Sequence, residues 1–319
     1  MFGLILAIAC MVIWGLTDIF DKKGSPREDP LACYKFMVWQ GIISSILVIA
    51  LAPMSETGIL LLAQLRKNAV YILISMAYPI SIMFGLNGMR YLDASIASPL
   101  ENIDGMIAPI FMLIYFLATG TIESIGSVLS VWNFIGVALV ITGVILIGKV
   151  EQELADQDTT VLADGKKKRI GAKALIFPLA YSIFDAAFTV SGGVILYSEG
   201  SVAMGEMDYT ILYNLAFAVS GLFSYLYIWV KTKHPYHPFR KTETPKLFSG
   251  IMDPLGGVCY TYALAANPVL FAPITSSYCV VTIFASHILL KEKLQKKQYT
   301  CLGILVAGIV ILAVSSGEN

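Results

Sequence analysis

Long apolar segments separated by short polar connections follow one another along almost the whole chain. A helix needs about 20 apolar residues to cross the hydrocarbon core of a bilayer, where it satisfies its own backbone hydrogen bonds. The pattern therefore predicts an all-α integral membrane protein with ten transmembrane helices. The predicted spans lie at about residues 2–20, 32–52, 68–89, 94–118, 131–149, 171–197, 208–230, 247–266, 270–290 and 299–315.

Prolines inside these spans are expected to interrupt the helices, because proline lacks a backbone N–H and crowds the preceding turn. The carbonyl groups that they free can line a substrate path, and the kinks can act as hinges. The prolines concerned are Pro79, Pro99, Pro109, Pro178, Pro254 and Pro273.

Composition narrows the classes of protein that fit this pattern. The chain has 319 residues, of which 57% are hydrophobic and 14% charged, and its mean hydropathy is +0.74. A soluble domain has about 25% charged residues, so a water-soluble enzyme and a disordered protein are both excluded. Lys+Arg and Asp+Glu number 22 each, which leaves no net positive charge to attract nucleic acid. The five cysteines lie in or beside apolar runs and are expected to be free thiols.

Basic residues mark one side of the membrane. Lys and Arg accumulate in cytoplasmic loops, and here all of them except Arg66 and Lys67 lie in or beside the odd-numbered connections. This distribution predicts that both termini are extracytoplasmic, and it would predict the reverse if one middle span were miscounted. The first apolar run starts at Phe2 without a positive segment before it, so it is interpreted as a retained span. With no transit segment in view, the plasma membrane of a prokaryotic-type cell is expected.

An internal repeat divides the chain. The longest polar stretch, residues 151–170, is interpreted as a cytoplasmic linker between two halves, 1–150 and 171–319, of five spans each. Tyr78-Pro79 in the first half matches Asp253-Pro254 in the second, and Pro99 matches Pro273. Two tandem repeats with an odd number of spans face opposite ways, so an inverted repeat is predicted, an architecture typical of secondary transporters.

Several short motifs carry a family resemblance. Trp14-Gly15 lies in the first span, and Ala108–Phe111 is followed by Glu123 and Gly136. The second half has Leu290–Leu294, which contains Glu292, followed by Gly303 and Gly308. With ten spans in two halves, the chain resembles the drug/metabolite transporter superfamily, EamA type, over nearly its whole length. The resemblance implies a carrier of small metabolites, which in this family include amino acids, nucleotide precursors, cations and cofactors.

The second half departs from the family pattern at two places. In addition, the positions of two glutamates indicate a structural role. No proline matches Pro109, because Tyr278 falls near that position, and the counterpart of Trp14-Gly15 is Tyr181-Ser182 or a neighbour. Glu123 and Glu292 lie at membrane edges, so they are expected to stabilise helix ends rather than contact substrate.

Carboxylates within the spans are the most informative residues. Glu101 and Asp104 lie in the fourth span, Asp185 in the sixth and Asp253 in the eighth, whereas Asp18 lies near the cytoplasmic end of the first. A charge at a helix centre costs about 2.5–3.5 kcal/mol on insertion scales, so these acids are predicted to face the interior. No Lys or Arg lies at similar depth in the sequence pattern. Glu101 and Asp104 are three residues apart and are expected to share one helix face.

Three interpretations of these acids remain open: a cavity for an organic cation, a proton relay, or structural carboxyls bonded to neighbouring polar groups. Aromatic side chains favour cations, because their ring faces attract positive charge, and Trp14 and Tyr78 are the preferred candidates. The predicted substrate-binding residues are Glu101, Asp104, Asp185, Asp253, Trp14 and Tyr78.

The sequence thus favours a secondary transporter of a small organic cation or zwitterion, with alternating access and protons as a candidate coupling ion. The alternative is a carrier of neutral amino acids or related metabolites in which the acids are structural. A remote alternative is an intramembrane enzyme: Asp185 and Asp253 could imitate a catalytic pair, but the Gly-x-Gly-Asp signature and the other catalytic motifs are absent. No cofactor or metal is expected. One copy of the chain can enclose a cavity, so a monomer is expected to suffice.

Overall fold

The computed structural model describes residues 2–66, 68–120, 131–157, 171–197 and 203–315, and within these ranges the chain is helical and contains no strand. The first half of the chain contains α1 (Phe2–Gly24), α2 (Ala32–Leu51), α3 (Gly58–Ala63), α4 (Ala69–Ser75), α5 (Ala77–Tyr91), α6 (Ala94–Glu101), α7 (Asp104–Ala118) and α8 (Val131–Gln157). The second half contains α9 (Ile176–Tyr197), α10 (Glu206–Thr232), α11 (Thr244–Ala266), α12 (Pro268–Ser276), α13 (Tyr278–Ala285) and α14 (Lys296–Ser315). Short helical turns occupy Gly171–Leu175, Lys241–Glu243 and Ser286–Leu290.

Helices occupy all ten predicted ranges, and α3 is an additional short helix. Within the described residues, five segments are long and apolar enough to cross a membrane by themselves: Phe2–Gly24, Ala32–Leu51, Ala69–Tyr91, Gly171–Tyr197 and Glu206–Thr232. Ile107–Ala118 and Ile274–Leu290 are shorter apolar helical segments. The chain is therefore a multi-pass membrane protein, and the full number of ten crossings stays a prediction.

Three of the predicted spans are broken helices. The breaks are at Met76 between α4 and α5, at Asn102 and Ile103 between α6 and α7, and at Ser277 between α12 and α13. Each lies within four residues of Pro79, Pro99 or Pro273, as expected from the N–H that proline lacks.

The other prolines do not break a helix, so the prediction that all six interrupt a span is wrong. Pro109 and Pro254 lie inside the continuous helices α7 and α11. Pro178 is the third residue of α9, in a first turn, where an N–H has no helical partner in any case.

The polarity of the bundle is reversed relative to a water-soluble protein. Large apolar side chains face outward: Phe2 is 71% exposed, Ile49 73% and Phe223 64%. Polar side chains such as Ser44 and Asn214 are fully buried between helices. An apolar surface of this extent would be a liability in water, and it is suited to contact with lipid.

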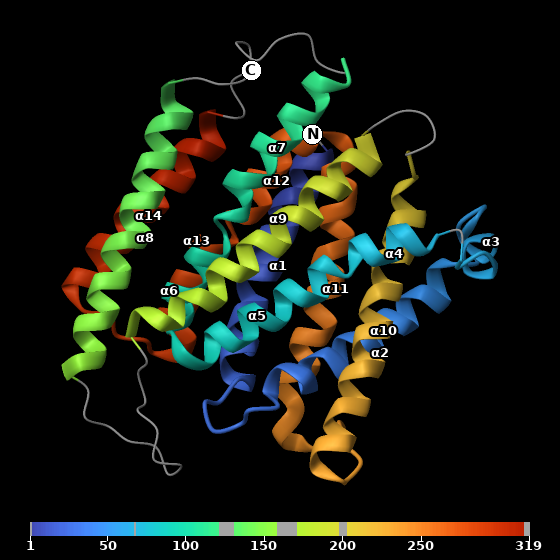
Figure 1. Cartoon of the computed structure of the whole chain (residues 1–319), viewed down its shortest axis with the longest axis horizontal. Helices are drawn as coiled ribbons and strands as arrows, with labels where there is room; N and C mark the ends of the chain where they lie inside the picture. The colour runs from blue at the N-terminus through green and yellow to red at the C-terminus, as the bar shows by residue number, and fades with distance from the viewer. Residues whose placement is uncertain (1, 67, 121–130, 158–170, 198–202, 316–319) are drawn as a thin grey trace.

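The helices pack in pairs that join the two halves. α2 packs on α10, α1 on α11, α5 on α9, and α8 on α14, a pair that stands at one side of the bundle (Figure 1). The start of α1 and the end of α14 lie at one end of the bundle, here called the terminal end. The connections 25–31 and 233–240 lie at the opposite end, called the basic end because Lys22, Lys23 and Arg27 belong to it.

Candidate functional site

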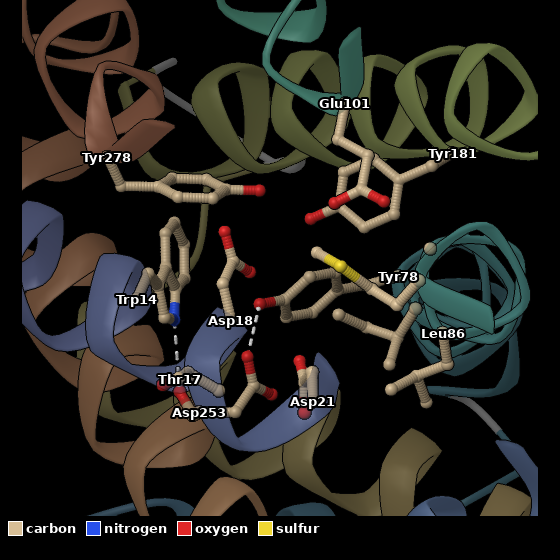
Figure 2. A pocket seen from close by; sticks show the side chains of 13 residues that line it. Trp14, Thr17, Asp18, Asp21, Tyr78, Leu86, Glu101, Tyr181, Asp253 and Tyr278 are labelled. Atoms are coloured by element: carbon tan, nitrogen blue, oxygen red, sulfur yellow. Dashed lines mark hydrogen bonds between the residues drawn. The ribbon is translucent and has the colours of Figure 1, made fainter. Parts of the chain in front are cut away.

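A pocket in the middle of the bundle extends toward the basic end. The empty space among its lining atoms amounts to about 380 Å³, a figure that includes open solvent, and residues of α1, α5, α6, α9, α11 and α13 line it (Figure 2). The lining consists of Trp14, Thr17, Asp18, Asp21, Tyr78, Ile82, Gly85, Leu86, Met89, Glu101, Tyr181, Asp253 and Tyr278.

Helical periodicity places one face of α1 and one face of α5 on this pocket. On α1 the lining residues run from Trp14 to Asp21 at spacings of three and four, and on α5 they run from Tyr78 to Met89. At 1.5 Å per residue, the α5 face covers about 16 Å of the bundle's length. Gly85 lets neighbouring helices approach, because a Cβ there would lie 2.8 Å from the Tyr181 ring.

Asp253 is held by donors from three other helices. Tyr78 Oη donates to Asp253 Oδ1 at 3.1 Å, and Gln40 Nε2 of α2 donates to Oδ2 at 3.3 Å. Trp14 Nε1 donates to the Asp253 carbonyl oxygen at 3.2 Å, and Figure 2 shows this bond and the Tyr78 bond. The Asp253 carboxyl group is therefore fixed at the junction of α1, α2, α5 and α11.

Asp18 is tied to the helices that carry two of the breaks. Thr282 Oγ1 of α13 donates to Asp18 Oδ2 at 2.6 Å, and Ser98 Oγ of α6 lies 3.2 Å from Thr282 Oγ1. Glu101, the last residue of α6, is only 2% exposed, and its Oε1 has no hydrogen-bond partner among the described residues. In Figure 2 the side chains of Asp18 and Glu101 point into the same central space as the Tyr278 hydroxyl.

Asp104 and Asp185 lie outside this lining and form a second, buried group. Ser276 Oγ donates to Asp104 Oδ2 at 3.0 Å, and Ser81 Oγ donates to Asp185 Oδ1 at 3.4 Å. Both side chains are buried, with Asp104 3% and Asp185 8% exposed.

Glu101 and Asp104 do not share a helix face, so that prediction is wrong. Glu101 ends α6 and Asp104 begins α7, and the break at Asn102 and Ile103 separates them. A spacing of three residues brings side chains together only where the helix is continuous.

The pocket brings together four of the six predicted residues, Trp14, Tyr78, Glu101 and Asp253. Sequence reasoning did not select Asp18, which it placed near the cytoplasmic end of the first span, and it did not consider Asp21. A signal for Asp18 was present: it follows Trp14 by four residues, as Asp185 follows Tyr181, the matched aromatic of the second half.

The lining is acidic and lacks a compensating base. It contains four carboxylate side chains, and no Lys, Arg or His occurs among the residues that line it in the described part of the chain. Lys22 lies nearby, but its Nζ donates to the carbonyl oxygens of Met89 at 2.8 Å and Leu92 at 2.5 Å, where α5 ends. Four tyrosine and tryptophan rings complete the wall. The arrangement can bind a cation and can take up and release protons.

Aromatic side chains close the bundle between this pocket and the terminal end. Tyr78 stacks on Phe188 with ring centroids 4.7 Å apart, and Thr189 Oγ1 lies 2.6 Å from Tyr260 Oη. Tyr209 fits against Gly192, where a Cβ would lie 2.6 Å from the tyrosine hydroxyl. These side chains fill the bundle on the side of the pocket that faces the terminal end.

Glu292 caps a helix. Its carboxylate accepts from the backbone N–H groups of Ala94 at 2.9 Å and Ser95 at 3.1 Å, and from Ser95 Oγ at 2.7 Å. These groups begin α6, so the predicted helix-end role of Glu292 is confirmed. Its matched residue Glu123 lies outside the described residues.

Comparison with known families assigns the chain. The sequence pattern of the EamA-like transporter family matches residues 1–149 and 174–314. The chain belongs to the EamA-like transporter family. This EamA-like protein is accordingly a membrane transporter of small molecules rather than a member of an enzyme family.

The fold has a counterpart among solved structures. A crystal structure of another protein aligns over 99% of this EamA-like chain and 99% of its own, with a TM-score of 0.59 and 10% sequence identity. At that identity the likeness concerns the fold alone. No curated protein matches the chain. Among the described residues, no group of three or more His, Cys, Asp or Glu side chains is placed to hold a metal ion.

Proposed function

We propose that this EamA-like protein is a secondary transporter of a small organic cation or zwitterion, that it works by alternating access, and that protons are its candidate coupling ion. The observation that carries the proposal is the pocket with four carboxylates, an aromatic wall and no basic residue among its described lining. A carboxylate at a helix centre costs about 2.5–3.5 kcal/mol on insertion scales. Bound cations or protons would offset that cost.

The aromatic wall favours an organic cation. Trp14 lies 6.3 Å from Tyr78, 5.2 Å from Tyr260 and 5.9 Å from Tyr278, measured between ring centroids. Ring faces attract cations that lie within about 6 Å of the centroid, and the attraction grows as the site excludes water. An inorganic cation would not need this apolar area.

The packing of the helices supports two inverted five-helix halves, residues 1–150 and 171–319, joined by the linker 151–170. Exchanging the halves matches α1 with α9, α2 with α10, α5 with α11 and α8 with α14. Under this exchange the pairs α2–α10 and α8–α14 map onto themselves, and the pair α1–α11 maps onto α9–α5. That is the behaviour expected of a two-fold axis between the halves.

Individual residues follow the same exchange. Tyr78 and Asp253 occupy matched positions beside Pro79 and Pro254, and they are hydrogen-bonded to each other at 3.1 Å. Two matched residues can touch only near the axis. The pocket, which contains both, thus lies between the halves, where transporters with inverted repeats bind their substrates.

One specific observation favours the alternative, a carrier of neutral metabolites with structural acids. Asp18, Asp104, Asp185 and Asp253 each accept a hydrogen bond from a Thr, Ser or Tyr hydroxyl. Buried carboxyls with such partners can serve packing alone. Glu101 Oε1 has no such partner, and for this reason the cation carrier is preferred.

Ligand-induced thermal stabilisation of the detergent-purified protein tests the proposal. The panel contains primary and quaternary amines, neutral amino acids, nucleobases and sugars, each at two pH values. We expect an organic cation to raise the melting temperature and Asp253→Asn to abolish this shift. Glu153→Gln, which changes an exposed carboxylate paired with Lys297 at 2.7 Å, is the control and should respond like the unmodified chain.

The opposite result would support the carrier of neutral metabolites. If only neutral amino acids or sugars stabilise the protein, and Asp253→Asn binds them as the unmodified chain does, the acids are structural and the cation carrier is refuted.

A further inference from the structure

Two carboxylates of the pocket, Glu101 and Asp21, each have an oxygen without a hydrogen-bond partner among the described residues, and the deeply buried Glu101 restricts the chemistry of the cargo. Glu101 is 2% exposed, lines the pocket, and has one oxygen, Oε1, without a hydrogen-bond partner among the described residues. A buried acceptor left unpaired is costly, and an ammonium N–H forms a strong, charge-assisted hydrogen bond with a carboxylate. A quaternary ammonium group has no N–H and could not satisfy this oxygen.

The pocket also has more negative groups than one ammonium would balance. Asp18, Asp21 and Asp253 line it together with Glu101, and Asp18 and Asp253 approach it from α1 and α11, on other sides than α6. A cation with charges at two points along its length can meet carboxylates on different helices at once. A single ammonium can be close to only one or two of them.

The apolar part of the lining suits a methylene chain. Ile82, Leu86 and Met89 follow one another on the α5 face of the pocket. Aliphatic stems of charged groups lie along such surfaces while their charged heads reach polar partners. In Figure 2 Leu86 lies on the α5 side of the space, apart from Asp18 and Asp253.

We infer that the cargo is an aliphatic diamine or polyamine with primary ammonium groups, and that Glu101 is a residue that selects for N–H donors. The inference rests on the proposed function and narrows it. The methylene chain lies along α5, one ammonium group donates to Glu101, and another is held by the carboxylates of α1 and α11.

A matched ligand series on the unmodified full-length protein in detergent tests the inference without any variant. The probes are putrescine, its bis-trimethylammonium analogue, butylamine and butanediol, and dissociation constants are measured by calorimetry. Because a hydrogen bond to a charged group is worth about 1.5–3 kcal/mol, we expect putrescine to bind about tenfold or more tightly than the bis-trimethylammonium analogue. Butylamine should bind more weakly than putrescine, and butanediol should not bind.

The variant Glu101→Gln tests the role of this carboxylate in binding. Glutamine keeps the shape of the side chain but removes its charge, so putrescine affinity should fall about tenfold, whereas affinity for the bis-trimethylammonium analogue should change little. The control is Glu153→Gln at the surface. Unchanged putrescine affinity in Glu101→Gln would overturn the inference.

The outcomes separate the inference from the proposed function. If the bis-trimethylammonium analogue or butylamine binds as tightly as putrescine, the diamine inference fails and the cation carrier stands. If none of the three amines binds and neutral metabolites do, both fail.

Discussion

At the scale of single residues, Glu292 stabilises a helix of the site although its own side chain does not line the pocket. It accepts from two backbone N–H groups of α6, the helix that presents Ser98 and Glu101. We expect Glu292→Ala to lower the free energy of unfolding by about 1–2 kcal/mol, as the loss of a helix cap does. Denaturant titration in detergent micelles measures this change, with Glu153→Gln as the exposed control. An unchanged midpoint would mean that water replaces the carboxylate at no cost.

The residues of the site were predictable to different degrees. The burial of acids in the middle of spans follows from the cost of charge in lipid, which is why Glu101 and Asp253 were found from the sequence. Asp18 was not selected, because it lies near the cytoplasmic end of its span, close to Lys22 and Lys23 in the chain. Depth along a helix does not reveal which face a residue occupies, and contact with Thr282, far away in the sequence, decided the position of Asp18.

At the scale of helices, α2 and α10 cross at two glycines. A Cβ on Gly221 would lie 2.7 Å from the Gly41 Cα and 2.8 Å from the Met37 carbonyl oxygen, both of which are backbone atoms. Small residues at such crossings let helix backbones approach in a membrane. We expect Gly221→Ala to force the helices apart and to destabilise the protein by about 1–3 kcal/mol.

Gly303→Ala is the matched control for this crossing. Gly303 lies in α14, and a Cβ there would meet nothing within 4 Å. The alanine should stabilise α14 by about 0.5–1 kcal/mol, because glycine is the poorer helix former. Opposite signs for the two substitutions, measured as melting temperatures in detergent, are the expected result. Equal small effects would show that α2 and α10 do not cross as closely as described.

The helices themselves were more predictable than their interruptions. Hydrophobic length located helical segments at every predicted range, because the membrane sets that length. Proline alone did not locate the breaks: Pro254 is accommodated inside α11, whereas α6 ends two residues after Pro99. A proline kinks or ends a helix according to its tertiary neighbours, and these are not contained in the local sequence. The break between α6 and α7 separates Glu101 from Asp104, and as a result only Glu101 lines the pocket.

At the scale of the whole molecule, the two ends of the bundle differ in charge and in access. The pocket extends toward the basic end, and the layer of Phe188, Tyr209 and Tyr260 closes the terminal end. If basic connections lie in the cytoplasm, the pocket lies on the cytoplasmic side of this aromatic layer. The exchange of the halves then predicts a second conformation in which Asp104 and Asp185, the group now buried, become accessible from the other side.

The orientation of the chain decides on which side of the membrane the basic end lies, and this orientation can be measured directly. Glu28 is exposed in the first connection, at the basic end, and Glu56 is exposed in the second connection, which follows α2. All five native cysteines are buried or half-buried, so single cysteines introduced at these two positions will dominate labelling. We expect an impermeant thiol reagent to label Glu56→Cys in intact cells and to label Glu28→Cys only after permeabilisation. The reverse pattern would place the basic connections, and the end toward which the pocket extends, outside the cell. Each variant is the control for the other, because both replace an exposed glutamate and differ only in the side of the membrane.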